Sequence, residues 1–212
     1  MKAHLAFISL CLLVLGAFAA TEVLQPGPGD AKDVFIWGKY PDNNNEGNYL
    51  FSGYDGGFVL DLIQFDGLDD AMFDGANINS ATLALYPRSS SSWGGAPPID
   101  VVFRMITETW DPATVTWNTM PGMDFTDEFY FNITQDTTWV EVDLTDFVVE
   151  WVENGAPNYG FIFGPPSDPG LMGVCYYNGE ETDNPSYRPK LTVDYSGASV
   201  VETSWGSIKA LD

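Results

Sequence analysis

Residues 107–122 read Thr-Glu-Thr-Trp-Asp-Pro-Ala-Thr-Val-Thr-Trp-Asn-Thr-Met-Pro-Gly. Asp111-Pro112 indicates a turn, because proline fixes its own φ and moves the preceding residue out of the helical region. Residues 114–117 alternate polar and apolar side chains, and β-branched and aromatic types dominate. This pattern predicts a short half-buried strand with Val115 and Trp117 on one face. A second turn over residues 118–122 closes it.

The two tryptophans of this stretch, Trp110 and Trp117, allow two interpretations. Tryptophans beside a tight turn can form a platform on which a sugar ring stacks. They can equally fill the end of a β-sandwich core, since tryptophan is buried over most of its surface in folded proteins.

Alternating patterns recur along the rest of the chain and predict a series of strands separated by Gly- and Pro-rich turns. These strands are expected at residues 33–37, 48–52, 58–65, 78–86, 99–105, 139–144, 159–163, 174–178 and 190–195. One short helix is expected over residues 145–154, with Thr145 as its N-cap and Asn154-Gly155 as its stop. The fold class is therefore all-β, an antiparallel β-sandwich with one short α-helix.

The ends of the chain differ in composition from this central region. Residues 1–20 resemble a secretory signal peptide, with Lys2 before an apolar run and a small-residue cleavage site at Ala17-Phe18-Ala19. Residues 21–31 are an extended lead-in, and residues 32–195 form the sandwich domain. Residues 196–212 are a C-terminal tail whose apolar character suits an edge strand, a docking peptide or a sorting signal. We expect a secreted protein, extracellular or on the cell surface.

The chain is strongly acidic, with 30 Asp and Glu against 8 Lys and Arg, a net charge of −22. Removal of residues 1–20 takes one lysine and makes the charge −23. Such a charge argues against nucleic acid and anionic membranes as partners, because like charges repel. No stretch beyond the signal is apolar and long enough to span a membrane.

Catalysis finds little support in the residue types. The single histidine, His4, lies in the signal, so the mature chain has no histidine for a triad or a metal site. Cys175 is then the only cysteine, and we interpret it as a small buried hydrophobic residue. A glycosidase with paired carboxylates or a polysaccharide lyase remains an alternative, but the abundance of acids singles out no pair.

Calcium is the cofactor that the composition allows, because most side chains that could bind a metal offer hard oxygen ligands. The loop Asp42-Asn43-Asn44-Asn45-Glu46 is dense in such oxygens, and Asp33 could share an ion with Asp194 if the first and last strands are neighbours. The alternatives are an Asx-rich turn whose side chains bond their own backbone, and two exposed acids at strand ends. We expect one structural calcium ion.

Sugar binding requires exposed aromatic faces beside hydrogen-bonding groups. By their loop or strand-end positions, the candidates are Trp37, Tyr40, Tyr54, Trp93, Tyr176 and Tyr177. Trp139 and Trp151 are expected in the core.

A family resemblance joins several of these segments. Trp110–Pro121 resembles the W-x-x-x-x-V-T-W-N-x-x-P segment of the DNRLRE domain family, secreted β-sandwiches related to carbohydrate-binding modules. Further similar segments follow in the family's order, at residues 33–36, 62–66, 79–86, 142–151, 158–161 and 188–193. The chain departs from the family at Asp183–Arg188, where the name-giving string is interrupted. The resemblance implies jelly-roll topology.

From the residues and this resemblance we expect a non-catalytic binding module that recognises an extracellular or cell-wall polysaccharide, or a cell-surface glycan. The alternative is a structural or adhesion protein of the cell surface or matrix that self-associates through edge strands or the C-terminal tail.

Overall fold

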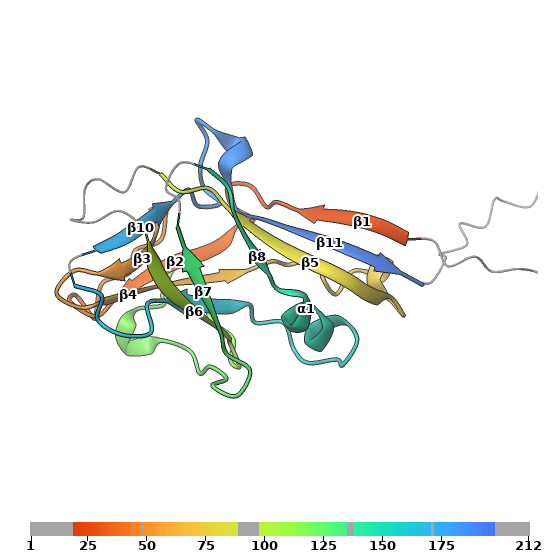
Figure 1. Cartoon of the computed structure of the whole chain (residues 1–212), viewed down its shortest axis with the longest axis horizontal. Helices are drawn as coiled ribbons and strands as arrows, with labels where there is room; N and C mark the ends of the chain where they lie inside the picture. The colour runs from red at the N-terminus through yellow and green to blue at the C-terminus, as the bar shows by residue number, and fades with distance from the viewer. Residues whose placement is uncertain (1–18, 48, 89–97, 135–137, 171, 198–212) are drawn as a thin grey trace, which may run out of the picture.

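The computed structural model describes residues 19–47, 49–88, 98–134, 138–170 and 172–197, which form two antiparallel sheets and one α-helix (Figure 1). The four-stranded sheet has the order β1 (Ala19–Leu24), β11 (Lys190–Ser196), β5 (Asn77–Leu85) and β8 (Val140–Asp143). The seven-stranded sheet has the order β10 (Met172–Tyr176), β3 (Leu50–Tyr54), β4 (Phe58–Gln64), β9 (Phe161–Gly164), β6 (Ile99–Met105) and β7 (Phe129–Ile133), and β2 (Lys32–Trp37) pairs with β4. The predicted all-β sandwich is confirmed.

The main core lies between the two sheets and follows from strand alternation. On β5 and β11, every second residue points inward and is buried, as with Leu83, Leu85, Leu191 and Val193. These side chains meet the inward residues of the other sheet, which include Phe103, Phe161 and Phe163. The rings of Phe103 and Phe163 stack with centroids 4.7 Å apart. A continuous apolar layer therefore joins the sheets.

Helix α1 (Thr145–Val152) covers one end of this core with Phe147, Val148 and Trp151. Thr145 was expected as the N-cap, but it is the first helical residue and Leu144 occupies the cap position. The preceding Asp143 supplies the missing acceptor, because its carboxylate receives the Thr145 N–H at 2.9 Å and the Thr145 hydroxyl at 2.5 Å. Three 3-10 turns complete the regular structure: η1 (Ala71–Phe73), η2 (Trp117–Thr119) and η3 (Pro185–Tyr187).

Two strands were missed by the sequence patterns. The expected lead-in of residues 21–31 begins as β1, which pairs with β11 over six residues from Ala19↔Ser196 to Leu24↔Leu191. The strand β7 was also unexpected, and it pairs with β6 from Ile99↔Ile133 to Phe103↔Phe129. Both form a sheet edge, where only one side of the strand has a neighbour and where burial patterns are weak. The tail beyond residue 197 lies outside the described residues.

The stretch at residues 107–122 does not form the predicted strand. Residues 112–114 make a turn and residues 117–119 form η2. The apolar side chains of this segment are nevertheless buried, with Trp110 7 % and Val115 3 % exposed. They pack on Val34, Ile36, Leu62 and Ile162, which form a second core on the other face of β2, β4 and β9. The segment thus covers the outer face of the seven-stranded sheet.

Hydrogen bonds hold this covering segment in place. The Trp110 indole N–H donates to the carbonyl of Tyr159 at 2.8 Å. The Asn44 amide donates to the carbonyls of Pro112 and Val115 at 2.7 and 2.8 Å. A buried carbonyl without a hydrogen-bond donor lowers the stability of the fold. These side chains donate to the carbonyls of an irregular segment, as the backbone of a neighbouring strand would.

Truncation of Trp110 tests this description. Trp110→Ala is expected to lower the free energy of unfolding by about 3–5 kcal/mol, the usual cost of an emptied aromatic site in a core. Trp110→Phe keeps most of the volume but leaves the Tyr159 carbonyl without its donor, so it should cost about 1–3 kcal/mol. Urea unfolding of both variants, with exposed Asp111→Asn as the control, measures the difference. Equal stability of Trp110→Ala and wild type would show that the segment is not part of the cooperative fold.

Candidate functional site

Four aromatic side chains gather at one end of the four-stranded sheet. Three strand ends meet there, because β5 ends where its antiparallel neighbours β8 and β11 begin. Leu85 pairs with Val140, so Tyr86 and Trp139, one residue beyond this pair, face each other across the two strands. Because Leu85 and Val140 point into the core, Tyr86 and Trp139 point outward. The loop of residues 177–189 adds Tyr177 and Tyr187.

These four residues, Tyr86, Trp139, Tyr177 and Tyr187, are called the aromatic platform. Tyr86 and Tyr187 stack with centroids 4.0 Å apart and an interplanar angle of 12°. Trp139 meets Tyr86 edge-on at 5.2 Å, and Tyr177 lies 5.2 Å from Tyr187. All four side chains are half-buried. The rings therefore support one another and still present part of their surface to solvent.

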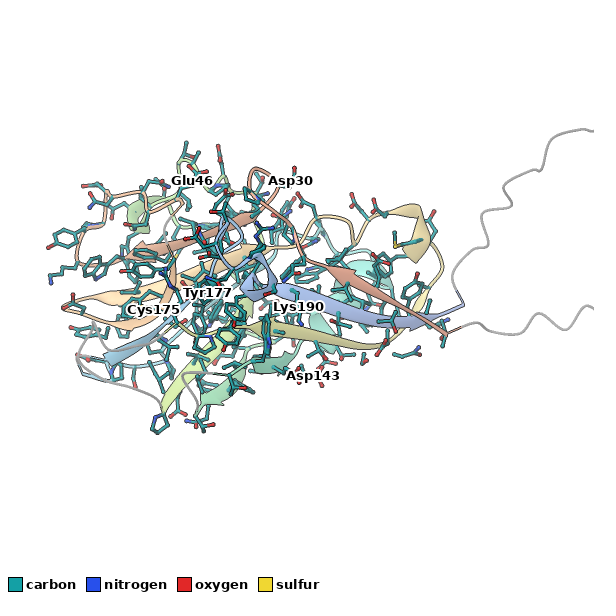
Figure 2. All side chains as sticks on the ribbon, turned by 90° about the horizontal axis from the view of Figure 1, so that it is seen from above. Asp30, Glu46, Asp143, Cys175, Tyr177 and Lys190 are labelled. Atoms are coloured by element: carbon teal, nitrogen blue, oxygen red, sulfur yellow. The ribbon has the colours of Figure 1, made fainter. Side chains whose placement is uncertain are left out.

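Two basic side chains lie over this platform. The Lys190 ammonium is 4.3 Å from the Trp139 ring centroid, and the Arg88 guanidinium is 5.1 Å from that of Tyr177. In the described part of the chain, neither forms a salt bridge with a carboxylate, whereas Lys39 pairs with Asp55 and Arg104 with Glu128. In so acidic a protein, cations held by aromatic faces form a distinct electrostatic surface. Figure 2 labels Tyr177 and Lys190, which both lie towards the middle of the molecule in this view.

The structure distributes the predicted sugar-binding aromatics differently. Tyr177 belongs to the platform. Trp37 and Tyr40 form a separate cluster at the end of β2, with centroids 4.8 Å apart and the Lys39 ammonium over both rings. Tyr54 packs on Phe58 in the adjacent β3–β4 hairpin. An ion pair of 3.5 Å between Lys39 and Asp55 connects this hairpin to the Trp37–Tyr40 cluster. Trp93 lies outside the described residues.

Tyr176 does not fit the predicted role. It is 0 % exposed and packs on Phe163 in the main core, so no ring face is available to a ligand. Alternation explains the difference, because Tyr177 is the next residue and points the opposite way. Trp151 is in the core, as expected, whereas Trp139 is half-buried on the platform.

The predicted pairing of Asp33 with Asp194 is wrong. Asp33 lies on β2 in the seven-stranded sheet and Asp194 on β11 in the other. Asp33 accepts the Gly179 N–H at 2.7 Å. Asp194 accepts the hydroxyls of Thr21 and Ser80. The neighbour of the last strand is β1, which was not anticipated, and therefore the premise of the pairing fails.

The loop at residues 42–46 uses several of its polar groups within the protein. Asp42 accepts the Asn118 amide at 2.8 Å, Asn45 donates to the Phe35 carbonyl at 3.1 Å, and Asn44 both holds residues 112–115 and accepts the Glu46 N–H. Asn43 is exposed. Within the described ranges no group of three or more His, Cys, Asp or Glu side chains has a geometry suited to a metal ion. The contacts are those of an Asx-rich anchoring loop.

Two buried carboxylates lie on neighbouring strands of the seven-stranded sheet. Asp61 pairs with Phe35, so Asp33 and Asp61 are diagonal neighbours on one face of β2 and β4. Asp61 is 0 % exposed and accepts the Phe51 N–H and the Ser52 hydroxyl, both at 2.6 Å. Burial raises the pKa of Asp61 to about 8 and that of Asp33 to about 7, despite these hydrogen bonds. Both carboxylates are buried in the fold.

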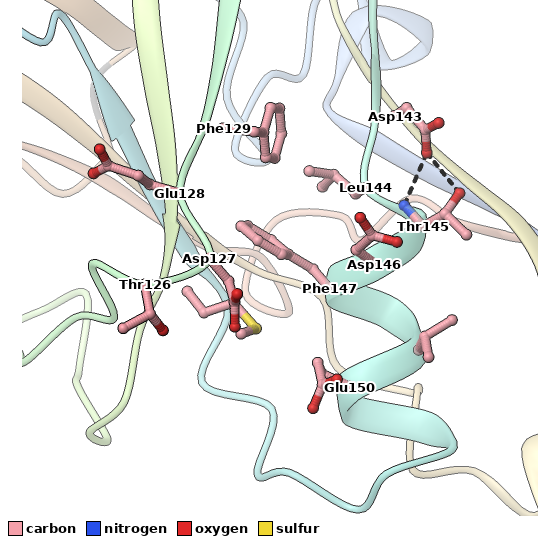
Figure 3. A pocket seen from close by; sticks show the side chains of 12 residues that line it. Thr126, Asp127, Glu128, Phe129, Asp143, Leu144, Thr145, Asp146, Phe147 and Glu150 are labelled. Carbon is pink, nitrogen blue, oxygen red and sulfur yellow. Dashed lines mark hydrogen bonds between the residues drawn. The ribbon is translucent and has the colours of Figure 1, made fainter.

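A cleft of about 550 Å³ opens between α1 and the start of β7 (Figure 3). Phe129 and Phe147 line it, with ring centroids 5.5 Å apart. Asp146 and Glu150 project from the helix, and Asp127 faces them from the segment before β7 (Figure 3). Glu128 also lines the cleft, but its carboxylate binds Arg104 at 2.7 Å.

Residues 60–195 match the model of carbohydrate-binding module family 96. This match covers more than half of the chain, and the protein belongs to that family. No curated protein sequence matches the chain. In the described part of the chain, no helix is long and apolar enough to cross a membrane.

Sequence reasoning missed three of the four platform residues. Tyr86, Trp139 and Tyr187 come from segments separated by about fifty residues each, and only the strand order β11-β5-β8 brings them together. A usable signal was present, since Tyr86 ends one predicted strand, Trp139 begins another and Lys190 begins a third. If those three strands had been predicted as neighbours in one sheet, the pairing register would have placed these residues together.

The buried carboxylate Asp61 makes stability depend on pH. Its folded-state pKa is raised, so its stabilising contribution is complete below the unfolded pKa near 4 and is lost as pH rises through about 8. Asp61→Asn resembles the protonated acid, since its amide can accept from Phe51 and donate to Ser52. We expect the stability of this variant relative to wild type to be greater at pH 9 than near pH 5.

Chemical denaturation across this pH range checks the expectation. Asp194→Asn is the matched control, because Asp194 is a half-buried strand carboxylate that also accepts two hydroxyl groups. The control should keep the wild-type loss of stability between pH 5 and pH 9. Asp33, whose pKa is also raised, leaves Asp61→Asn part of this loss. If Asp61→Asn loses as much stability as the control, Asp61 does not contribute to the pH dependence.

Proposed function

We propose that the protein is a secreted, non-catalytic module that binds an extracellular or cell-wall polysaccharide through the aromatic platform. The observation that carries the proposal is the convergence of Tyr86, Trp139, Tyr177 and Tyr187 at one sheet end, inside the span of the family match. The apolar C–H face of a sugar ring packs on such aromatic faces, and polar neighbours bind its hydroxyls.

The neighbouring sheet surface suits a ligand with many hydroxyl groups. Beyond the platform, the outward positions of the four-stranded sheet carry Thr82 opposite Thr192, and Glu141 beside Ala84. These are short or carboxylate side chains on a regular strand surface, and they offer acceptors and donors next to the rings. The corresponding face of the seven-stranded sheet is covered by Trp110 and Val115. The open face and the platform therefore lie on the same sheet.

A non-catalytic role agrees with the placement of the perturbed acids. A general acid must touch the substrate and have a pKa near the working pH. Asp33 and Asp61 have such pKa values but are 8 % and 0 % exposed, and their oxygens bind Gly179, Phe51 and Ser52. Their raised pKa values are a consequence of burial in the fold.

Removal of a platform ring should weaken polysaccharide binding. Trp139→Ala and Tyr187→Ala are each expected to lower the affinity for a retained polysaccharide about tenfold, in keeping with about 1 kcal/mol or more for one aromatic contact. Affinity electrophoresis and pull-down on cellulose, xylan, mannan, laminarin and chitin measure this, with thermal melts to confirm folding. Tyr40→Ala is the control, because Tyr40 is 46 % exposed but lies outside the family span. Loss of binding in Tyr40→Ala alone would move the site to the Trp37–Tyr40 cluster.

We also propose, separately, that the loop of residues 42–46 binds a structural calcium ion through the carboxylates of Asp42 and Glu46. A site filled at about 100 times its dissociation constant would add about 2.7 kcal/mol to stability. Melting in excess calcium should then occur several degrees above melting in chelator. Asp42→Ala should abolish the shift and Asp33→Ala should retain it. Equal melting temperatures of the wild type in both buffers would contradict a calcium site and leave the loop as an anchor for residues 112–118.

A further inference from the structure

The loop of residues 177–189, which connects β10 to β11, is called the platform loop (Figure 1). It joins the two sheets and presents Tyr187, whose ring stacks on Tyr86 with centroids 4.0 Å apart. Apart from η3, the loop consists of turns and irregular structure. Its contacts with the rest of the fold therefore determine where Tyr187 lies.

Hydrogen bonds within the platform loop make most of it one unit. The Glu181 carboxylate accepts the N–H groups of Asp183 and Asn184, both at 2.8 Å. The Tyr187 N–H donates to the Asn184 carbonyl at 2.9 Å, and Arg188 Nε donates to the Glu181 carbonyl at 2.6 Å. A shift at the start of the loop is therefore passed on to Tyr187.

The start of the platform loop is held by a buried carboxylate. Asp33 on β2 is 8 % exposed, and it accepts the Gly179 N–H at 2.7 Å. A Cβ atom at residue 179 would lie 2.1 Å from the Ala31 Cβ, so this close approach requires glycine. Breaking a buried hydrogen bond leaves two unsatisfied polar groups unless water enters. The contact therefore breaks only when the loop moves away.

The contacts between the platform loop and the lead-in are exposed to water. Gln25 donates to the Arg188 carbonyl at 2.9 Å, and the Gly29 N–H donates to the Glu180 carboxylate at 3.2 Å. Water competes for such exposed bonds, so each contributes little to the position of the loop. The buried contact with Asp33 is the stronger restraint.

The surroundings of Asp33 oppose a negative charge while the loop is docked. Loss of hydration is the main effect, and it raises the pKa of Asp33 to about 7 despite the hydrogen bond to its carboxylate. Glu180 of the loop and Asp61 of β4 add negative charge nearby. Cys175 and Tyr176 of β10, which adjoin Asp61, stay neutral because burial raises the pKa of both side chains.

Two cations in this region lie over aromatic rings. Lys32 precedes Asp33 on β2 and points to the opposite face, where its ammonium is 5.4 Å from the Trp110 ring centroid. The Arg88 guanidinium lies over Tyr177. In the described part of the chain, neither forms a salt bridge with Asp33. An ionised Asp33 is therefore stabilised mainly by water, which reaches it when the platform loop moves away.

We propose that Asp33 is a positioning residue for the aromatic platform, because its bond to Gly179 holds the loop that presents Tyr187. Asp33 lies outside the platform and acts on a ligand only through this loop. Its effect on ligand binding rests on the proposed function, whereas its effect on the loop does not. The loop is docked most firmly while Asp33 carries its proton.

The pH dependence of loop docking has a defined direction. With the loop moved away, the hydrated Asp33 carboxyl has a pKa near its ordinary value of 3.8, against about 7 when the loop is docked. Docking is therefore strongest below about pH 4 and weakens as pH rises through about 7. One proton is involved, so the ratio of docked to undocked loop changes by at most about tenfold per pH unit.

Amide hydrogen exchange between pH 5 and pH 8, corrected for intrinsic rates, measures this effect. In the wild type, protection of residues 179–188 should fall by up to about tenfold per pH unit and level off above about pH 7. Asp33→Asn can still accept the Gly179 N–H but carries no charge, so its loop protection should not depend on pH. Asp183→Asn changes an exposed carboxylate of the same loop and is the matched control, which should keep the wild-type profile.

Binding of a retained polysaccharide at pH 5 tests whether the loop acts on the platform. Asp33→Ala removes the acceptor and should lower the affinity about tenfold, as expected for Tyr187→Ala. Added to Tyr187→Ala, it should lower the affinity no further, because both changes act through the same ring. Gly179→Ala disturbs the same contact from the loop side and replaces Asp33→Ala in this test if that variant does not fold.

Three results would contradict the inference. The first is an unchanged exchange profile in Asp33→Asn, and the second is additive loss of affinity in the double variant. The third is loop amides as protected as those of β5, since the loop would then open only when the whole domain unfolds. If the wild type retains no polysaccharide, the proposed function fails, and the exchange profile still decides whether Asp33 holds the loop.

Discussion

The need to cover the outer face of the seven-stranded sheet determines which surface of the protein stays open. Val34, Ile36, Leu62 and Ile162 are buried on that face, and a sheet with apolar residues on both sides requires a second layer. Residues 107–122 supply the layer without forming a strand. Their position depends on the Trp110 hydrogen bond to Tyr159 and on the Asn44 bonds. Among the described residues, no such layer covers the four-stranded sheet, whose outward positions include Thr82, Thr192 and Glu141.

Charge is arranged unevenly over this framework. The protein has a net charge of −22, yet Lys190 and Arg88 lie over aromatic rings, with no carboxylate paired to them among the described residues. An ammonium ion over a ring keeps most of its hydration and gains a contribution of about 0.5–1 kcal/mol at an exposed site. The arrangement places two cations beside the rings of the platform.

Local patterns in the sequence predict where the strands lie along the chain, but they do not predict the order of the strands in the sheets. Nine strand segments and the helix at residues 145–154 were predicted, because apolar residues recur there at strand or helix spacing. The strand at residues 114–117 was a false prediction. Val115 and Trp117 have the right spacing, but the backbone of this segment is satisfied by Asn44 and by turns. Side-chain hydrogen bonds from another loop cannot be read from alternation.

The candidate site was predicted less well than the fold, for a related reason. Tyr177 was identified, whereas Tyr86, Trp139 and Tyr187 were not, since their proximity follows from the β11-β5-β8 order. Asp33 was identified as important but given the wrong partner. Its carboxylate holds Gly179, which begins the loop that carries Tyr187.

This contact connects the core to the platform. A Cβ atom at Gly179 would lie 2.1 Å from the Ala31 Cβ and 2.9 Å from the Asp33 carboxylate, so only glycine fits. Further along, the same loop is held by Gln25 at the Arg188 carbonyl and by Arg188 at the Glu181 carbonyl. Gln25 directly follows β1, and Asp33 lies on β2. The loop that carries Tyr187 is thus held both by Asp33 on β2 of the seven-stranded sheet and by Gln25, which follows β1 of the four-stranded sheet.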